Sequence, residues 1–279
     1  TNFGTVAPSS GWRDAGSTVQ INASPPSVVD GEQYVWLGWS GSGNGNYTGM
    51  NNPANITMNS PITETASWRH EYRLIMNTNF GTTNPYVGEH WYEAGSTVEI
   101  NATAPSVISG EQYVWLGWTG TGNGNSSGMA NPANLTMNGP ITETAAWRHE
   151  YYLTVTSPHD SPTPTSAWFE AGESITASVT SPWPLGATDT RYVCTGWTGT
   201  GSVPPSGTTT SVTFTIKAPS SIAWKWKTQY LLTVRTFPDG LTPEPARNPP
   251  GEAGSGGWWY DNPTNVQLTA QTVIGYEFL

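Results

Sequence analysis

Cysteine and lysine are nearly absent from this chain of 279 residues. The one cysteine, Cys194, cannot form a disulfide within the chain, and we expect it to be a buried, unreactive thiol. The lysines are confined to Lys217, Lys225 and Lys227, so a lysine–asparagine isopeptide bond cannot form within the residues that precede them. Covalent cross-links therefore do not stabilise the first half of the chain.

Charged residues make up only 11% of the chain, and the net charge is −10. So few Lys and Arg side chains argue against a nucleic-acid partner, because nucleic acid selects for basic patches. No apolar run approaches the roughly 18 residues that a membrane span needs, so none is expected in this segment. No signal peptide is visible either, and we expect a mature or truncated chain. Uncharged polar side chains must keep the surface soluble.

Helical periodicity is also missing, and alternation with period two takes its place. The stretch E-T-A-S-W-R-H-E-Y-R-L-I-M at Glu64–Met76 returns 79 residues later at Glu143–Val155 and, more loosely, after the same interval at Ile222–Val234. One parity in each copy is apolar, and no Gly or Pro interrupts it, which predicts a single long strand. We interpret this strand as the last of one repeat running directly into the first of the next, a stiff linker.

The interval divides the chain into four predicted repeats: 1–70, which lacks the opening strand, 71–149, 150–228, and the partial repeat 229–279. Repeat four also carries a Pro-rich insertion at Phe237–Gly251. Repeat one without its opening strand and repeat four without its later strands favour the interpretation that the sequence is a segment cut from a longer array. The alternative is a unit that borrows strands from its neighbours.

Five strands are predicted in each repeat. In repeat two they are Tyr72–Met76, Val98–Ala102, Tyr113–Trp118, Asn134–Met137 and the exit strand through Trp147. The W-Y-E-A-G-S motif at Trp91–Ser96 is predicted to be a turn, and the third strand of repeat four is cut short at Tyr276–Leu279. Because β-branched and aromatic residues dominate, we predict an all-β array of small five-stranded β-grasp-like or β-sandwich-like repeats joined by continuous strands.

Tryptophan must supply much of the stability, because a repeat of fewer than about 80 residues buries little apolar surface. Each buried tryptophan removes on the order of 200 Å² from water. Tryptophan recurs at two places in the repeats. One set of tryptophans lies in the motif G-W-[ST]-G-[ST]-G, and a second set lies in the exit strand. The predicted aromatic anchors are Trp39, Trp118 and Trp197 in the first set, and Trp68, Trp147 and Trp226 in the second.

The motif order is Y-x-L-x-V, W-Y-x-A-G-S-x-V, Y-V-x-x-G-W-[ST]-G and then M-N-x-P-I-T-E-T-A-x-W. It resembles the internalin B-repeat family in its divergent form. The resemblance covers the whole chain, most closely repeats one and two, and repeat three departs from it after Gly201. It implies a β-rich unit that occurs in tandem in bacterial and archaeal surface proteins, in stalks, adhesins or surface layers. The T-G-N-G-N-x-x-G loop is most familiar from archaeal surface proteins, and the resemblance supplies no catalytic residues.

Residues that could carry chemistry lack the partners that chemistry needs. The Gly-rich loops Gly41–Gly49 and Gly120–Gly128 have no Gly-Lys-[Ser/Thr] ending and no carboxylate, so we expect flexible surface loops rather than phosphate or calcium sites. His70 and His149 recur without a second ligand or base, and are expected to face solvent or pack at a repeat junction. We therefore predict no enzyme, no cofactor and no metal site.

Six N-x-[S/T] sequons occupy matching positions in repeats one and two. Asn22 and Asn55 alternate with inward-facing apolar residues and should point outward, and Asn46 lies in a Gly-rich loop. The alternative is that they are solvated asparagines in turns. The predicted N-glycosylation candidates are Asn22, Asn46, Asn55, Asn101, Asn125 and Asn134.

Taken together, the patterns favour a non-enzymatic extracellular structural protein, either a rigid stalk or the subunit of a cell-surface filament. The expected partner is another copy or a continuous repeat array, with strand exchange between subunits as one means of assembly. One alternative is a carbohydrate-binding adhesin, because Trp12, Trp91, Trp168 and the pair Trp258-Trp259 lie near turns where rings can be exposed. Another is the non-catalytic arm of a larger secreted enzyme.

Overall fold

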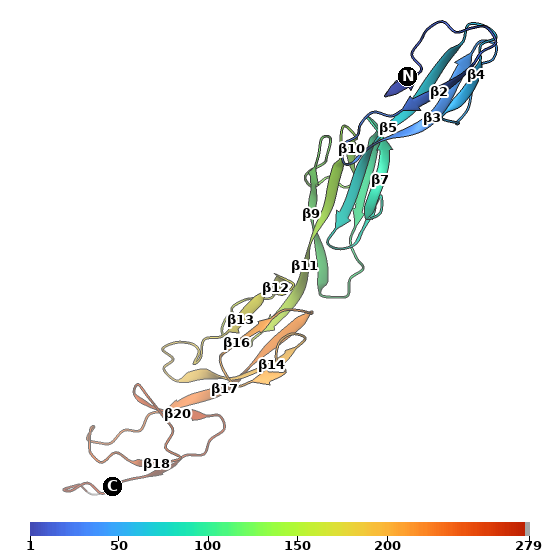
Figure 1. Ribbon diagram of the computed structural model, residues 1–279. Helices are drawn as coiled ribbons and strands as arrows, with labels where there is room; N and C mark the ends of the chain where they lie inside the picture. The colour runs from blue at the N-terminus through green and yellow to red at the C-terminus, as the bar shows by residue number, and fades with distance from the viewer. Residues whose placement is uncertain (277–279) are drawn as a thin grey trace. The chain divides into compact units, whose positions relative to one another are not determined.

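The computed structural model describes residues 1–276, which form β-strands and contain no helix (Figure 1). The prediction of an all-β chain is confirmed. The chain divides into two compact units, Thr1–Ser106 with Tyr113–Arg148 and Val107–Gln112 with His149–Leu279. The predicted third strand of repeat four, Tyr276–Leu279, extends beyond the described residues.

Repeat two shows the architecture most completely. One sheet has the strand order β10-β8-β6, and the facing strands have the order β7-β5-β11-β9. The strands are β5 (Thr63–Thr78), β6 (Thr82–Asn84), β7 (Gly88–Glu93), β8 (Thr97–Thr103), β9 (Glu111–Thr121), β10 (Ala133–Thr136) and β11 (Ile141–Thr156). The repeat is therefore a small two-sheet sandwich.

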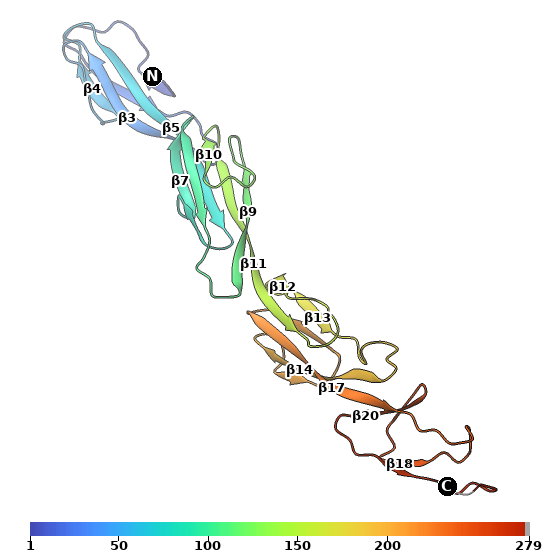
Figure 2. The same cartoon turned by 180° about the vertical axis from the view of Figure 1, so that it is seen from behind.

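The core of repeat two lies between these sheets. Leu74 and Met76 of β5 are fully buried against Ile100 of β8 and Leu135 of β10, and Trp118 is 1% exposed. The alternation in the sequence explains this arrangement, because every second residue of each strand faces the other sheet. The opening strand of the repeat thus lies at the centre of its sheet, between β7 and β11 (Figures 1 and 2).

The other repeats vary this plan. Repeat one contains β1 (Thr5–Ala7), β2 (Thr18–Ser24), β3 (Glu32–Ser42), β4 (Ala54–Thr57) and the first part of β5. Repeat three contains β12 (Ala167–Glu170), β13 (Ser174–Ser178), β14 (Thr190–Thr200), β15 (Ser206–Gly207), β16 (Ser211–Thr215) and β17 (Ser220–Leu232). Repeat four contains β18 (Ala246–Asn248), β19 (Glu252–Gly254), β20 (Gly257–Asp261) and β21 (Gln267–Thr269). Repeats one and three each have a buried core cluster of their own.

The long strands β5, β11 and β17 each belong to two consecutive repeats. Residues 63–72 of β5 pair with β3 of repeat one, and residues 71–76 pair with β7 of repeat two. In β17, residues 221–230 pair with β14 of repeat three and residues 229–232 pair with β20 of repeat four. The prediction that one uninterrupted strand closes a repeat and opens the next is confirmed.

The glycine of the G-W motif has a definite backbone role. The antiparallel register shifts between Trp36 and Gly38 and again between Cys194 and Gly196, as a β-bulge does. Gly38 and Gly196 have φ values of 108° and 122°, which L-residues with side chains rarely adopt. The bulge turns the following tryptophan into the core, so the motif couples a backbone distortion to an aromatic anchor.

One local prediction is wrong. Trp91–Glu93 belongs to β7 and Trp168–Glu170 to β12, and the turn is confined to the two residues that follow each strand. Both segments are strands because they pair antiparallel with an opening strand, with Tyr72 opposite Tyr92 in repeat two. This partner lies far enough away in sequence that local composition does not reveal it. In repeat one, where that strand is missing from the described residues, Trp12 lies in coil.

Candidate functional site

The six predicted aromatic anchors lie in or next to the three cores. Trp39, Trp118 and Trp197 are at most 6% exposed, Trp68 and Trp147 are nearly as buried, and Trp226 is half-buried. Trp36 packs on Trp39 and Trp68, with ring centroids 5.7 Å and 4.7 Å away. In repeat three, Cys194 takes the place of Trp36, and burial raises the pKa of its thiol.

All six sequon asparagines are exposed in the structure. Asn55 of β4 lies opposite Gln20 of β2, on the face that points away from the core. The loop asparagines differ from the strand asparagines, because Asn46 Nδ2 donates to Gly43 O at 2.5 Å and Asn125 Nδ2 donates to Gly122 O at 2.6 Å. Despite this difference all six side chains reach the surface, so the four strand asparagines (Asn22, Asn55, Asn101 and Asn134) are as accessible to modification as the two in the loops.

The Gly-rich loops are held in place by a carboxylate that sequence reasoning missed. Glu143 is completely buried, and its Oε1 accepts a hydrogen bond from the Ser126 N–H at 2.6 Å. Its Oε2 has no hydrogen-bond partner among residues 1–276. Glu64 is bonded in the same way to the Tyr47 N–H at 2.7 Å. Burial raises the pKa of both carboxyl groups, and the backbone hydrogen bond partly opposes this shift.

The signal for this carboxylate was present in the sequence. Glu143 has the same parity as Ala145 and Trp147, both buried, so alternation alone places it inside. The position 79 residues later is Ile222, in the repeat that lacks the Gly-rich loop. A Cβ added at Gly120 would overlap the Glu143 carboxyl group, so a glycine at this position leaves room for that group.

The histidines lie at the repeat junctions. His70 Nε2 is 2.6 Å from Glu32 Oε1, and its ring stacks on Tyr34 with centroids 4.5 Å apart. His149 lies in the same way 2.7 Å from Glu111 Oε1. Both histidines thus pack at a junction, which is one of the two placements expected from the sequence. Among residues 1–276 no cluster of His, Cys, Asp and Glu could hold a metal ion.

The same backbone contact recurs at three junctions, each time where an opening strand leaves the preceding repeat. Arg73 N donates to Gly31 O at 2.9 Å, Tyr152 N to Gly110 O at 2.8 Å, and Leu231 N to Asp189 O at 2.9 Å. Polar side chains reinforce each contact through the pairs Gln33–Glu71, Gln112–Glu150 and Arg191–Gln229. The same set of polar contacts therefore recurs beside each of these opening strands.

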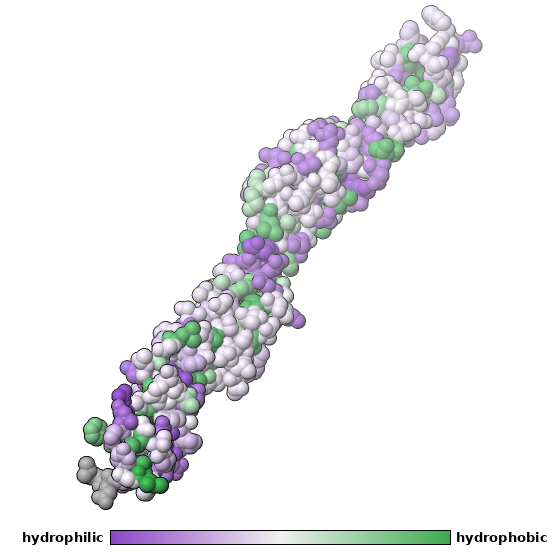
Figure 3. All heavy atoms as spheres, turned by 90° about the vertical axis from the view of Figure 1, so that its left-hand side faces the viewer, coloured by the Kyte–Doolittle hydropathy of each residue, from purple (hydrophilic) through white to green (hydrophobic). Residues whose placement is uncertain are grey.

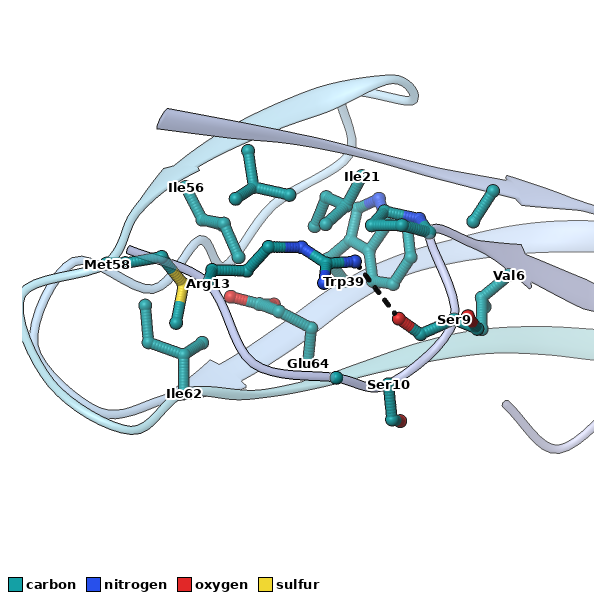
Figure 4. Close-up of a pocket in the computed structure, with 14 residues that line it drawn as sticks. Val6, Ser9, Ser10, Arg13, Ile21, Trp39, Ile56, Met58, Ile62 and Glu64 are labelled. Carbon is teal, nitrogen blue, oxygen red and sulfur yellow. Dashed lines mark hydrogen bonds between the residues drawn. The ribbon is translucent and has the colours of Figure 1, made fainter. Parts of the chain in front are cut away.

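Repeat one also carries an open groove of about 190 Å³ (Figure 4). Its floor consists of apolar residues of the repeat-one core together with Trp39, and Glu64 and Arg13 lie over this floor in Figure 4. The segment Pro8–Arg13 forms one wall, and the neighbouring Trp12 is fully exposed.

Comparison with protein families gives one match. Residues 1–71 match the model of the divergent InlB B-repeat domain. The resemblance predicted from the motif order is confirmed there, and it marks a repeat of the surface-protein type. Neither curated proteins nor solved structures gave a match. The part of the chain that the structure describes contains no helix able to span a membrane.

Proposed function

We propose that the chain is a non-enzymatic extracellular structural protein, a rigid stalk or a filament subunit of the cell surface. The observation that carries this proposal is the shared strand at each junction, which is reinforced by the recurring backbone bond beside it. A shared strand leaves no free linker residues, so we expect repeats one and two, which lie in one compact unit, to keep a fixed orientation. The match of repeat one to a surface-type domain supports the extracellular setting.

A distance measurement within repeats one and two tests the rigidity. Spin labels at Asn55→Cys and Asn134→Cys, equivalent exposed positions, are introduced in a Cys194→Ser background. We expect one narrow distance distribution, and a broad one after Gly-Gly-Ser is inserted between Glu71 and Tyr72. A broad distribution in the uninterrupted chain would contradict the proposal.

The surface supports N-glycosylation as part of the same function. Figure 3 shows a face that is mostly pale, with small scattered hydrophilic and hydrophobic patches, in keeping with the low charge content. Six exposed sequons would let glycans supply the hydration that charges do not. The test is the intact mass of native protein before and after chemical deglycosylation. Unmodified asparagines at all six positions would remove this part of the proposal.

A carbohydrate-binding role is the second candidate. Trp91 and Trp168 are 36% and 39% exposed although their strands are paired, so each offers part of a ring to a sugar. Glycan-array binding that is lost in Trp91→Ala and retained in Trp39→Phe would favour this role over the architectural one.

A further inference from the structure

Repeat three differs from repeats one and two in the side chains that could carry sugar. Residues 150–228 contain no asparagine, so no N-linked glycan can be attached to this repeat. Serine and threonine are frequent there, and many lie beside proline, as in S-P-H-D-S-P-T-P-T-S at Ser157–Ser166 and P-P-S-G-T-T-T-S at Pro204–Ser211. Segments rich in Ser, Thr and Pro are typical of O-glycosylated stalks.

The strand register shows that a hydroxyl group occupies one of the sequon positions. In repeat two the sequon residue Asn134 of β10 lies opposite Glu99 of β8. In repeat three, 79 residues later, the exposed Thr213 of β16 lies opposite Thr176 of β13. Thr213 therefore presents a hydroxyl group at the surface where repeat two presents an amide.

The loop that follows the anchor tryptophan changes in the same way. Gly128 in repeat two and Gly207 in repeat three each lie opposite the anchor tryptophan, which aligns the two loops. Three residues before this glycine, repeat two has the sequon asparagine Asn125. Repeat three has Pro204 there, followed by Pro205 and Ser206. The loop has thus exchanged an N-linked acceptor for serine and threonine next to proline.

The outward face of the sheet formed by β13 and β16 carries only hydroxyl side chains (Figure 1). The other parity is apolar and faces the core, with Ile175 and Phe214 both buried. The outward residues form three cross-strand pairs, which are Ser174–Thr215, Thr176–Thr213 and Ser178–Ser211. Five of these six side chains are exposed and Ser178 is half-buried. This face therefore offers neutral hydroxyl groups without a charged or aromatic neighbour in either strand.

The two proline-containing segments are the most accessible part of this surface. Thr208–Thr210 is exposed and lies in no strand, and the buried Val203 holds the start of the loop against the core. Ser161, Thr163 and Thr165 are exposed as well. Proline has no N–H to donate to a strand ladder, so such segments stay open to an enzyme that binds extended chain.

We propose that repeat three is modified by O-linked sugars, with Ser206, Thr208 and Thr210 as the principal acceptors. Thr209 is not among them, because its Oγ1 donates to Ser211 O at 2.5 Å. The inference rests on the proposed extracellular function, and it assigns to repeat three the hydration that N-linked glycans would give to repeats one and two.

The modification is a transfer from a phosphate-activated sugar. The hydroxyl oxygen attacks the anomeric carbon of the sugar and forms the new carbon–oxygen bond. The bond between that carbon and the phosphate oxygen breaks, the phosphate leaves with the electron pair, and the hydroxyl proton passes to a base of the transferase. The protein supplies only the hydroxyl group, so the exposure of the acceptor decides the site.

Peptide mass spectrometry of the native protein is the first test, with fragmentation that keeps the sugar on its residue. We expect whole sugar units on the peptide that contains Ser206–Ser211, and their release by alkali, which leaves N-linked sugars in place. Thr97 is the internal control, because it is exposed in repeat two without a proline neighbour and should be unmodified. Unmodified hydroxyl groups throughout repeat three would overturn the proposal, and so would equal modification of Thr97.

Variants produced in the native host test the acceptors. Ser206→Ala with Thr208→Val and Thr210→Val removes the three hydroxyl groups, and the sugar should be lost from this loop. Thr97→Val is the matched control and should leave the sugar on the loop unchanged. A loop that keeps its sugar in the triple variant would show that the acceptors are assigned wrongly.

The outcome is separable from the proposed function. Peptides that contain Asn46 and Asn125 report N-linked glycans, and the distance measurement between repeats one and two reports rigidity. Either of these can fail while the hydroxyl groups of repeat three are modified, and the reverse also holds.

Discussion

Repeats two and three solve the same packing problem in two ways. At one inward position repeat two has Glu143, which receives the Ser126 N–H of a Gly-rich loop, and repeat three has the fully buried Ile222. After Gly201, repeat three has a segment of different sequence in place of the loop, and this segment contributes the buried Val203 to its core. The comparison teaches that the carboxylate serves the loop and not the fold, because the fold forms with an apolar residue in its place.

The largest effect is expected from the anchor that both repeats share. Trp118→Ala in repeat two and Trp197→Ala in repeat three should each destabilise their own repeat by about 3–5 kcal/mol, through lost burial and the cavity left behind. Hydrogen exchange of β9 and β14 amides measures each repeat separately. The partly exposed Trp168 is the control, since its alanine variant should cost far less. Equal protection of β9 in Trp118→Ala and wild type would show that the anchor is dispensable.

The next effect comes from exchanging the distinguishing residue alone. Ile222→Glu places a carboxyl group in a core that has no loop amide to donate to it, and should cost about 3 kcal/mol. Ala223→Glu, on the exposed face of the same strand, should be nearly neutral. Urea unfolding followed by exchange at β14 measures the difference. If Ile222→Glu were tolerated, the carboxylate would not depend on the loop.

A smaller effect is expected where loop and carboxylate touch. Gly120→Ala places a methyl group against the Glu143 carboxyl and should cost about 1–3 kcal/mol through overpacking. Gly139→Ala is the control, because its Cβ would meet the nearest atom at an ordinary 3.7 Å. In a double-mutant cycle, adding Glu143→Ala should recover much of the stability that Gly120→Ala loses. Additive costs in that cycle would mean that the two groups do not interact.

The smallest effect depends on pH. Because burial raises the pKa of Glu143 in the folded state, stability is greatest below the ordinary carboxyl pKa and falls as pH rises through the raised value. Glu143→Gln keeps the acceptor for Ser126 and cannot ionise, so it should be more stable than wild type at neutral pH by about 1 kcal/mol or less. The measurement is unfolding of both proteins from pH 4 to 8. A pH slope for repeat two that is identical in both would contradict the assignment.

How far the sequence predicts the fold depends on whether a residue's partner is local. The alternating strands at Val98–Ala102 and Tyr113–Trp118 were predictable because each pattern is complete within a few residues. The strand β7 was not predictable, because its residues have the composition of a turn and become a strand only through pairing with β5. The candidate groove was not predicted, because its walls come from segments more than 50 residues apart. The burial of Glu143 was predictable from its parity with Ala145 and Trp147, but a charged side chain is ordinarily expected to face water.

The parallel pairing of β5 with β11 determines how repeat two responds to tension. A pulling force along the chain enters this repeat at the start of its opening strand and leaves at the end of its closing strand. Because Leu74–Thr78 and Ile141–Ala145 run in the same direction, such a force slides the two strands past each other. Their hydrogen bonds are then loaded together in shear instead of being unzipped one after another. Repeat three has the same arrangement between β11 and β17, so each of these repeats resists extension with its whole set of interstrand bonds at once.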